Sequence, residues 1–263
     1  MSGTIRTERQ GALVFVTLSH PGKFNAMSRG MWRALRQIFV ALQADLSLRC
    51  VVLRGEGGHF CAGGDISEYP EFRFSEHGLR EFHEGDVWGG LQAMLDCDLP
   101  VVAQIEGNCM GAGVEIACCC DIRIATESAR FGAPIGRLGF PMAPRELALV
   151  LREAGALSAR EMLLEAGVLT AAQMQLRGFL QRVLPAAQLA EEISRTVQRV
   201  SALAPQAARL NKQALRVLQA VPADTAVTAL LAQAYAYADS AEHREGIHAF
   251  LAKRPADFSI SSS

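Results

Sequence analysis

Residues 105–117 read IEGNCMGAGVEIA, and this stretch decides the fold that we expect for the chain. It ends an apolar strand, turns on small residues and opens a helix that carries Glu115 in its first turn. Small residues let a ligand approach the backbone, and the first turn of a helix offers unpaired N–H groups to a developing negative charge. The stretch predicts a polarising site with a proton carrier beside it. A plain strand-to-helix corner with a solvated glutamate is the alternative.

A second glycine-rich stretch, GEGGHFCAGGDI at residues 55–66, follows the apolar strand at 50–53. It lacks the Gly-Lys-Ser/Thr ending of a phosphate-binding P-loop, and no dinucleotide-binding fingerprint is complete in the chain. Two strand-terminal loops that each present one backbone N–H group fit an oxyanion hole for a carbonyl.

The composition of the 263 residues favours a small-molecule protein. Half of the residues are hydrophobic, but no uninterrupted apolar run reaches the ~18 residues of a membrane span. The formal net charge is −1 and no long basic run appears, so nothing favours nucleic acid or an anionic membrane as a partner. The seven cysteines lack paired metal-ligand spacing and are predicted to be buried free thiols. We therefore expect a cytoplasmic protein without a metal site.

The order of elements predicts an α/β fold. Alternating or apolar runs predict strands at residues 5–8, 13–18, 51–53, 101–105 and 122–125, with a helix beginning near Ser28. The charged segment 67–98 is interpreted either as a mobile loop and helix that cover a ligand or as a solvated surface helix. From residue 158 the chain is expected to be mostly helical, with helix starts at Thr170 and Pro205 and an amphipathic stretch at 224–238.

Four motifs in this order resemble the crotonase superfamily, also called the enoyl-CoA hydratase/isomerase superfamily. They are HPGKFNAMS at residues 20–28, FCAGGDI at 60–66, GAGVE at 111–115 followed by CDIR at 120–123, and REGIHAFLAKR at 244–254. The resemblance implies a β-β-α spiral core that binds acyl-CoA at residues 1–185 and a C-terminal helical layer for trimerisation at residues 186–263. It also implies a homotrimer or a dimer of trimers.

The resemblance also assigns roles to particular residues. The backbone N–H groups of Ala62 and Ala112 would hold the thioester oxygen of an acyl-CoA, and Glu115 would carry the proton. Coenzyme A then enters as part of the substrate, and no separate cofactor is expected. The implied substrate contacts are Lys23, Ala26, Ala62, Gly63, Gly64, Asp65, Ile66, Gly111, Ala112, Ile135 and Lys253.

One departure from the family pattern concerns the second catalytic glutamate, because Ile135 stands at its position. Isoleucine cannot titrate, so three possibilities stay open. Glu115 acts alone as base and acid, a residue such as His83 or Glu84 replaces the missing group, or the protein binds acyl-CoA with little hydratase activity. Because Ile135 would remove solvent from Glu115, we expect the pKa of Glu115 to lie above its reference value of ~4.3.

Overall fold

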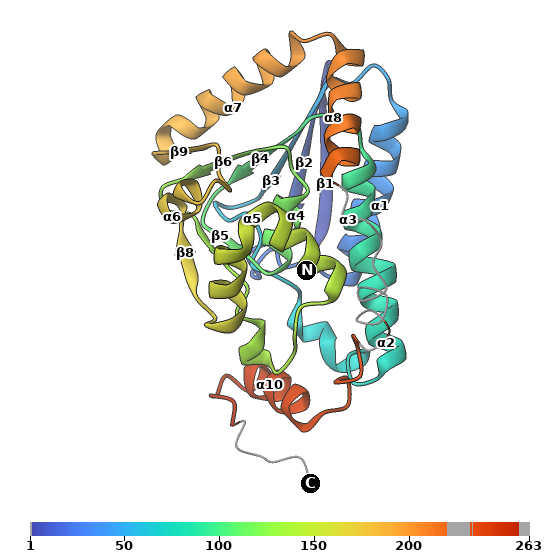
Figure 1. Cartoon of the computed structure of the whole chain (residues 1–263), viewed down its shortest axis with the longest axis vertical. Helices are drawn as coiled ribbons and strands as arrows, with labels where there is room; N and C mark the ends of the chain where they lie inside the picture. The colour runs from blue at the N-terminus through green and yellow to red at the C-terminus, as the bar shows by residue number, and fades with distance from the viewer. Residues whose placement is uncertain (1, 220–231, 233, 258–263) are drawn as a thin grey trace.

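The computed structural model, which describes residues 2–219, 232 and 234–257, contains a six-stranded sheet with helices on both faces (Figure 1). The strand order is β1-β2-β3-β4-β6-β9, in which β1 and β2 form an antiparallel hairpin and the later neighbours are parallel. A second sheet has the order β5-β7-β8. The strands are β1 (Thr4–Gln10), β2 (Leu13–Ser19), β3 (Cys50–Gly55), β4 (Val101–Ile105), β5 (Asn108–Met110), β6 (Ile122–Thr126), β7 (Arg130–Gly132), β8 (Val168–Thr170) and β9 (Arg182–Leu184).

Both faces of the parallel strands are buried, which explains their continuous apolar runs. In β3, Val51 and Leu53 face the main core, whereas Cys50 and Val52 face a second core beneath α7 (Ala186–Ser201). The α/β fold and all five predicted strands are therefore confirmed, although most strands extend beyond the predicted ends.

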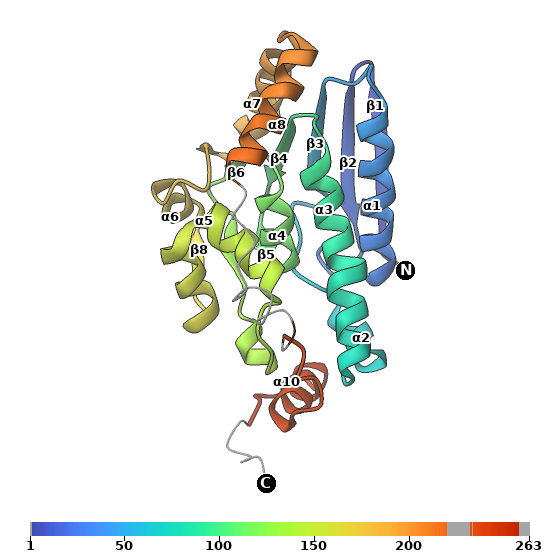
Figure 2. The same ribbon diagram turned by 45° about the vertical axis from the view of Figure 1, so that its right-hand side comes forward.

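Helices α1 and α3 lie side by side over the main core (Figure 2). Helix α1 begins after Ser28, whose hydroxyl accepts a hydrogen bond from the Met31 N–H group at 3.2 Å, as expected of an N-cap residue. The other helices of the first two thirds are η1 (Ile66–Glu71), α2 (Glu76–Arg80), the π-helix η2 (Glu81–Val87), α3 (Trp88–Asp96), α4 (Ala112–Cys118), η3 (Ile135–Leu138), α5 (Pro144–Leu164) and α6 (Ala171–Leu176), with α1 at Arg29–Ala44.

Segment 67–98 forms helices that enclose an internal cavity. Phe82, His83 and Val87 of η2 line this cavity together with Arg73 from the turn before α2. The interpretation as a cover over a ligand site is therefore favoured over that of a solvated surface helix.

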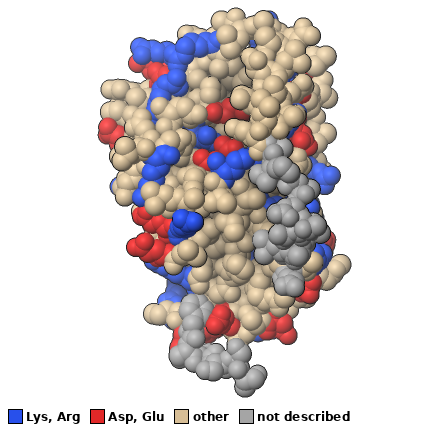
Figure 3. Space-filling model, viewed as in Figure 1, with Lys and Arg blue, Asp and Glu red and all other residues tan. Residues whose placement is uncertain are grey.

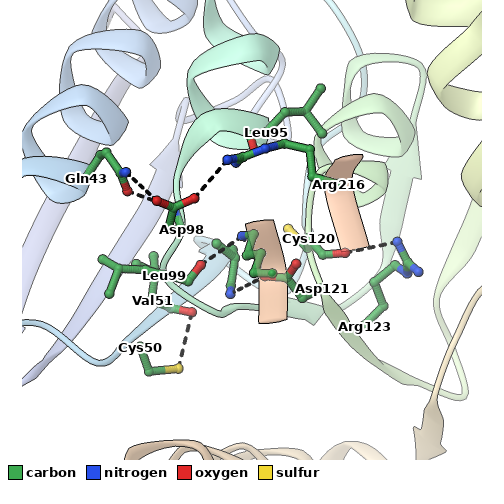
Figure 4. Close-up of polar contacts among 12 residues, drawn as sticks. Gln43, Cys50, Val51, Leu95, Asp98, Leu99, Cys120, Asp121, Arg123 and Arg216 are labelled. Atoms are coloured by element: carbon green, nitrogen blue, oxygen red, sulfur yellow. Dashed lines mark hydrogen bonds and ion pairs between the residues drawn. The ribbon is translucent and has the colours of Figure 1, made fainter. Parts of the chain in front are cut away.

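The C-terminal helices contact the core in different ways. Helix α7 buries Leu189 and Ile193 against the sheet, whereas α8 (Pro205–Gln219) has no buried residue and docks through polar side chains. Figure 4 shows Arg216 of α8 bound to Asp98 at 3.0 Å and to the Leu95 carbonyl at 2.7 Å. Helix α10 (Ala241–Leu251) packs against η3 and η1.

The mostly helical last third agrees with the sequence prediction, and helix starts after Thr170 and at Pro205 are confirmed. The amphipathic stretch predicted at 224–238 lies largely outside the described residues. The division into units 1–185 and 186–263 stays a prediction.

The surface carries both signs of charge, interspersed on the face seen in Figure 3. No described helix combines the length and apolar character that crossing a membrane requires. All seven cysteines are free and buried, and burial raises the pKa of each thiol. Three of them, Cys118 to Cys120, line a second cavity of about 350 Å³ next to α8.

Candidate active site

The loop after β3 is joined to the end of β5 by strand-like hydrogen bonds. The Cys61 N–H group donates to the Asn108 carbonyl at 2.9 Å, and the Met110 N–H group donates back to the Cys61 carbonyl at 2.8 Å. A second isolated bridge joins Met27 to Gly64. The two glycine-rich stretches of the sequence are therefore held together mainly by backbone hydrogen bonds, to which His59 adds one side-chain contact by accepting the Asn108 N–H group at 3.1 Å.

The amide of Ala62 is already engaged, since its N–H group donates to the Phe24 carbonyl at 3.0 Å. Gly64, two residues later, has no hydrogen-bond acceptor for its N–H group among the described residues. A Cβ atom at Gly64 would overlap the Tyr69 hydroxyl, so the close approach of Tyr69 requires glycine here. Unlike the amide of the predicted Ala62, the amide of Gly64 is therefore free to bind a ligand.

The second loop turns at Gly111, which has a φ of +48° and donates its N–H group to the Gly132 carbonyl at 2.8 Å. Ala112 is the first residue of α4, and its N–H group has no acceptor within the described part of the chain. At Gly113 a Cβ atom would lie 2.6 Å from the Cys61 carbonyl oxygen, so this position must also stay small. The amide of Ala112 thus lies at a helix start without an acceptor among the described residues, although the residue itself is buried.

Both loops border one largely apolar cavity of about 450 Å³. Its lining brings together most of the predicted site residues, namely Ala62, Gly63, Gly64, Ile66, Gly111, Ala112, Glu115 and Ile135. The free amides of Gly64 and Ala112 therefore belong to the same cavity, and a carboxyl group lies within it.

Four predicted contact residues lie outside the cavity lining. Lys23 forms an ion pair with Asp65 at 2.7 Å, and Ala26, three residues after Lys23, is buried. Lys253 is exposed, and its N–H group donates to the carbonyl of Phe250, whose side chain lines the cavity. Lys253 therefore lies near the cavity rim, whereas Lys23 is neutralised by a carboxylate.

Two carboxyl groups line the cavity, although the sequence analysis identified only Glu115. The second is Glu146, the third residue of α5, which is 3% exposed. Burial raises the pKa of Glu146 to about 8. Burial also raises the pKa of Glu115 well above its usual range, and the charge of Glu146 adds to this effect. The expected direction of the Glu115 shift is confirmed, with Glu146 as a cause that the sequence did not reveal.

His83 connects Glu146 to a buried guanidinium group. Its Nδ1 atom lies 2.8 Å from Glu146 Oε1, and its Nε2 atom lies 3.3 Å from an Arg73 nitrogen. Because a guanidinium has only N–H donors, Nε2 must accept and Nδ1 must carry the proton that is donated to Glu146. Burial and the charge of Arg73 lower the pKa of His83 well below its usual value, so the ring is neutral.

Arg73 is 1% exposed and is held between aromatic rings. Its guanidinium lies 4.0 Å from the ring centre of Phe140 and 4.4 Å from that of Tyr69. No carboxylate among the described residues lies within ion-pair distance of it. The cavity therefore contains one buried cation, two buried carboxyl groups and a neutral histidine.

Of the two residues proposed to replace the missing glutamate, only His83 reaches the cavity. Glu84 accepts a hydrogen bond from Tyr235 at 2.7 Å and pairs with Arg145 at 2.9 Å. Arg145 directly precedes Glu146 in the first turn of α5. Because Arg145 is paired with Glu84 instead, Glu146 turns into the cavity without a cation at ion-pair distance in the described structure.

Within the described ranges, no three His, Cys, Asp or Glu side chains lie close enough together to hold a metal ion.

Comparison with known proteins gives the same family along nearly the whole chain. A family model described as enoyl-CoA hydratase/isomerase matches residues 8–260. A probable enoyl-CoA hydratase of Rhizobium meliloti is 30% identical over 258 residues, which cover 97% of each chain. The 2,3-dehydroadipyl-CoA hydratase of Escherichia coli is 30% identical over 250 residues, 95% of this chain and 96% of that one.

Solved structures agree with this result. An enoyl-CoA hydratase/carnithine racemase from Magnetospirillum magneticum superposes with a TM-score of 0.80 at 35% identity, covering 98% of this chain and 96% of the other. A methylmalonyl-CoA decarboxylase in complex with 2-nitronate-propionyl-CoA gives a TM-score of 0.87 over 98% of each chain. At 24% identity, the decarboxylase shows the shared fold alone.

Proposed function

This chain belongs to the enoyl-CoA hydratase/isomerase family, and from that premise we propose that it stabilises the enolate of an acyl-CoA thioester in its 450 Å³ cavity. It is an acyl-CoA enzyme of the hydratase/isomerase type. The observation that carries the proposal is the convergence of two free amides and a buried carboxyl group, Glu115, on one apolar cavity.

The oxyanion hole is proposed to consist of the N–H groups of Gly64 and Ala112. A thioester carbonyl gains negative charge when an enolate forms, so two fixed donors stabilise the enolate more than the ground state. Ala62 was the donor expected from the sequence, but its amide is bound to Phe24. Gly64 takes its place because its amide is free and because the same loop holds it against the cavity.

Glu115 is proposed to carry the proton. A carboxyl group whose pKa is raised above its usual range can hold a proton and pass it to a substrate carbon. Ile135 lines the same cavity and supplies an apolar surface next to the reacting acyl group. Coenzyme A would enter as part of the substrate, and this chemistry needs no further cofactor.

The nucleotide end of coenzyme A is proposed to lie at the rim near Lys253, because an exposed cation attracts phosphate. A homotrimer or dimer of trimers also stays a proposal. It is supported by the exposed apolar side chains of α8, which include Leu210, Val217 and Leu218. A cytoplasmic location and a role in fatty acid metabolism likewise stay proposals.

A turnover panel tests the proposed function. The purified protein is incubated with crotonyl-CoA, 2,3-dehydroadipyl-CoA and a series of saturated and unsaturated acyl-CoA thioesters, and the products are followed by mass spectrometry. We expect the gain of one water, or a shifted double bond, for at least one thioester. Tight binding without any conversion would instead favour the second candidate, an acyl-CoA-binding protein, which is suggested by the apolar Ile135 at the position of a catalytic glutamate.

A further inference from the structure

We infer that Glu146 is the second catalytic carboxyl group of this site and that it replaces, from a different helix, the side chain that Ile135 cannot supply. The inference rests on the proposed function, because it assigns a further residue to the same reaction. It differs from the possibilities raised by the sequence, in which Glu115 acts alone or is assisted by His83 or Glu84.

The placement of Glu146 supports this role. Pro144 begins α5, so that Glu146 lies in the first helical turn, and its side chain lines the cavity together with Glu115 and Ile135. Ile135 belongs to η3, a separate short helix. A carboxyl group lost on one element is therefore present on the next element along the chain, within the same cavity.

Among the described residues, Glu146 has a hydrogen-bond donor, His83, that Glu115 lacks. Glu146 accepts the Nδ1–H group of His83, and the charge of Arg73 also favours its ionised form. Glu115 receives no hydrogen bond from the described residues, and the negative charge of Glu146 opposes its ionisation. The titratable and charged groups that face the pair are Tyr69, Arg73, His83, Glu84, Tyr235 and Tyr237.

Two buried carboxyl groups that repel each other share one proton over a wide pH range. Above the Glu146 pKa of about 8, Glu146 is the carboxylate, and its charge together with burial favours the carboxylic acid form of Glu115. This is the charge state that the addition of water to an enoyl thioester requires, since one group must take a proton and the other must give one.

The proposed step conserves atoms and electrons. The oxygen of a water molecule bonds to Cβ of the enoyl group while Glu146 takes one proton from that water. The electron pair of the C=C bond moves to form an enolate, whose charge rests on the thioester oxygen between the amides of Gly64 and Ala112. When the enolate collapses, Cα takes the proton of Glu115. Water has then been added across the C=C bond, Glu146 carries a proton and Glu115 is ionised. Transfer of one proton from Glu146 back to Glu115 restores the starting state.

Glu146→Gln tests the inference, with Glu191→Gln as the matched control because Glu191 is exposed on α7 and lies outside the cavity lining. Glutamine keeps the shape and can still accept the hydrogen bond from His83. We expect hydration to slow by about 10²–10⁴-fold in Glu146→Gln, whereas Glu191→Gln should stay within about twofold, as expected for a surface site without a role in the step. An unchanged rate in Glu146→Gln overturns the inference.

A second measurement does not depend on turnover. Infrared difference spectra of the protonated carboxyl band report the titration of Glu115 directly, with Glu115→Gln identifying the band. Glu146→Gln should lower the pKa of Glu115, because a like charge is removed. An unchanged titration overturns the coupled pair. If the wild type converts no thioester, the proposed function fails. The titration alone then tests whether the pKa of Glu115 depends on the charge of Glu146.

His83 is a positioning residue in this scheme, and a pH profile separates that role from simple packing. His83→Phe keeps a ring that can stack on Tyr235, now found 5.7 Å from His83, but it removes the N–H donor to Glu146. Loss of this donor should raise the pKa of Glu146, so the low-pH limb of the rate profile should move to higher pH by about one pH unit. Raising the pH should then restore the rate. A uniform loss at every pH contradicts the positioning role.

Discussion

The two walls of the cavity are built by different means. The backbone wall is the main chain of residues 61–64 and 110–112, and hydrogen bonds between neighbouring strand ends hold it together. The side-chain wall consists of Arg73, His83, Glu115 and Glu146, which come from four separate segments. The backbone wall offers neutral donors whose positions the sheet fixes. The side-chain wall offers charges whose state depends on each other and on pH.

The two walls therefore differ in the substitutions that they tolerate. On the backbone wall, a side chain matters only through its size, since Gly64 and Gly113 contact Tyr69 and Cys61 closely. On the side-chain wall, each residue sets the protonation of the others, so that a single replacement alters the whole group. Substitutions on the two walls should therefore have distinguishable signatures.

The largest effect is expected on the side-chain wall. Glu115→Gln should lower kcat/KM by about 10²–10⁴-fold, because glutamine cannot carry a proton. Thioester binding, measured by calorimetry, should remain within a few-fold, as the amides and the apolar lining are unchanged. The control is Glu106→Gln, which lies before the second loop but outside the cavity lining. Wild-type turnover in Glu115→Gln would assign the proton transfer to another group.

The backbone wall is tested by deleting one N–H group. Proline is tolerated at the first position of a helix, and Ala112 holds that position in α4. Ala112→Pro should lower kcat by about 10²–10³-fold, the usual cost of one oxyanion donor, and should leave the pH profile unchanged. Ala112→Gly keeps the amide and should lose little activity. Equal losses in both variants would show that packing, and not the amide, is responsible.

A stability measurement contrasts the walls by their response to pH. Burial raises the pKa of Glu146 to about 8 in the folded protein, compared with 4.5 in the unfolded chain. Between these two pH values the unfolded chain releases the proton more readily, so the free energy of unfolding falls as pH rises. Glu146→Gln should thus gain stability over the wild type across this window, by about 1–3 kcal/mol at pH 8. Thermal unfolding at several pH values measures the gain, and Ala112→Gly should show no such trend. If the stability advantage of Glu146→Gln over the wild type shrinks as pH rises, the pKa of Glu146 is not raised by burial.

The smallest effect is expected at the rim, which belongs to neither wall. Lys253→Ala should raise KM several-fold at low salt with little change in kcat, because an exposed cation attracts phosphate only weakly through water. High salt should abolish the difference. Arg195→Ala on α7 serves as the control, since Arg195 is exposed and pairs with Glu191. A KM effect that persists in high salt would indicate a direct, buried contact.

Local patterns predicted the backbone wall well. Apolar runs located the strands, and the small residues around Gly111 and Gly63 marked both loops. The sequence did not show that the Ala62 amide is already bound, because its acceptor, the Phe24 carbonyl, lies nearly 40 positions earlier in the chain. No spacing rule within the loop reveals which of two neighbouring amides is already occupied.

The side-chain wall was largely hidden from the sequence. Glu146 and His83 are 63 residues apart, and only the packing of η2 against α5 joins them. Glu146 directly follows Arg145 in the chain, but Arg145 pairs with Glu84 in the structure, and no local pattern shows this choice. The loss at Ile135 was visible, and the compensating carboxyl was not, because compensation in space leaves no mark in a linear motif.

The seven buried thiols also serve as intrinsic probes of local unfolding. A thiol-reactive reagent requires an exposed thiolate, and here burial both covers the sulfur atoms and raises their pKa. Cys118 to Cys120 border the second cavity, whereas Cys61 and Cys109 join the two loops of the site. The order in which the thiols are alkylated therefore reports which part of the molecule opens first, without any introduced label.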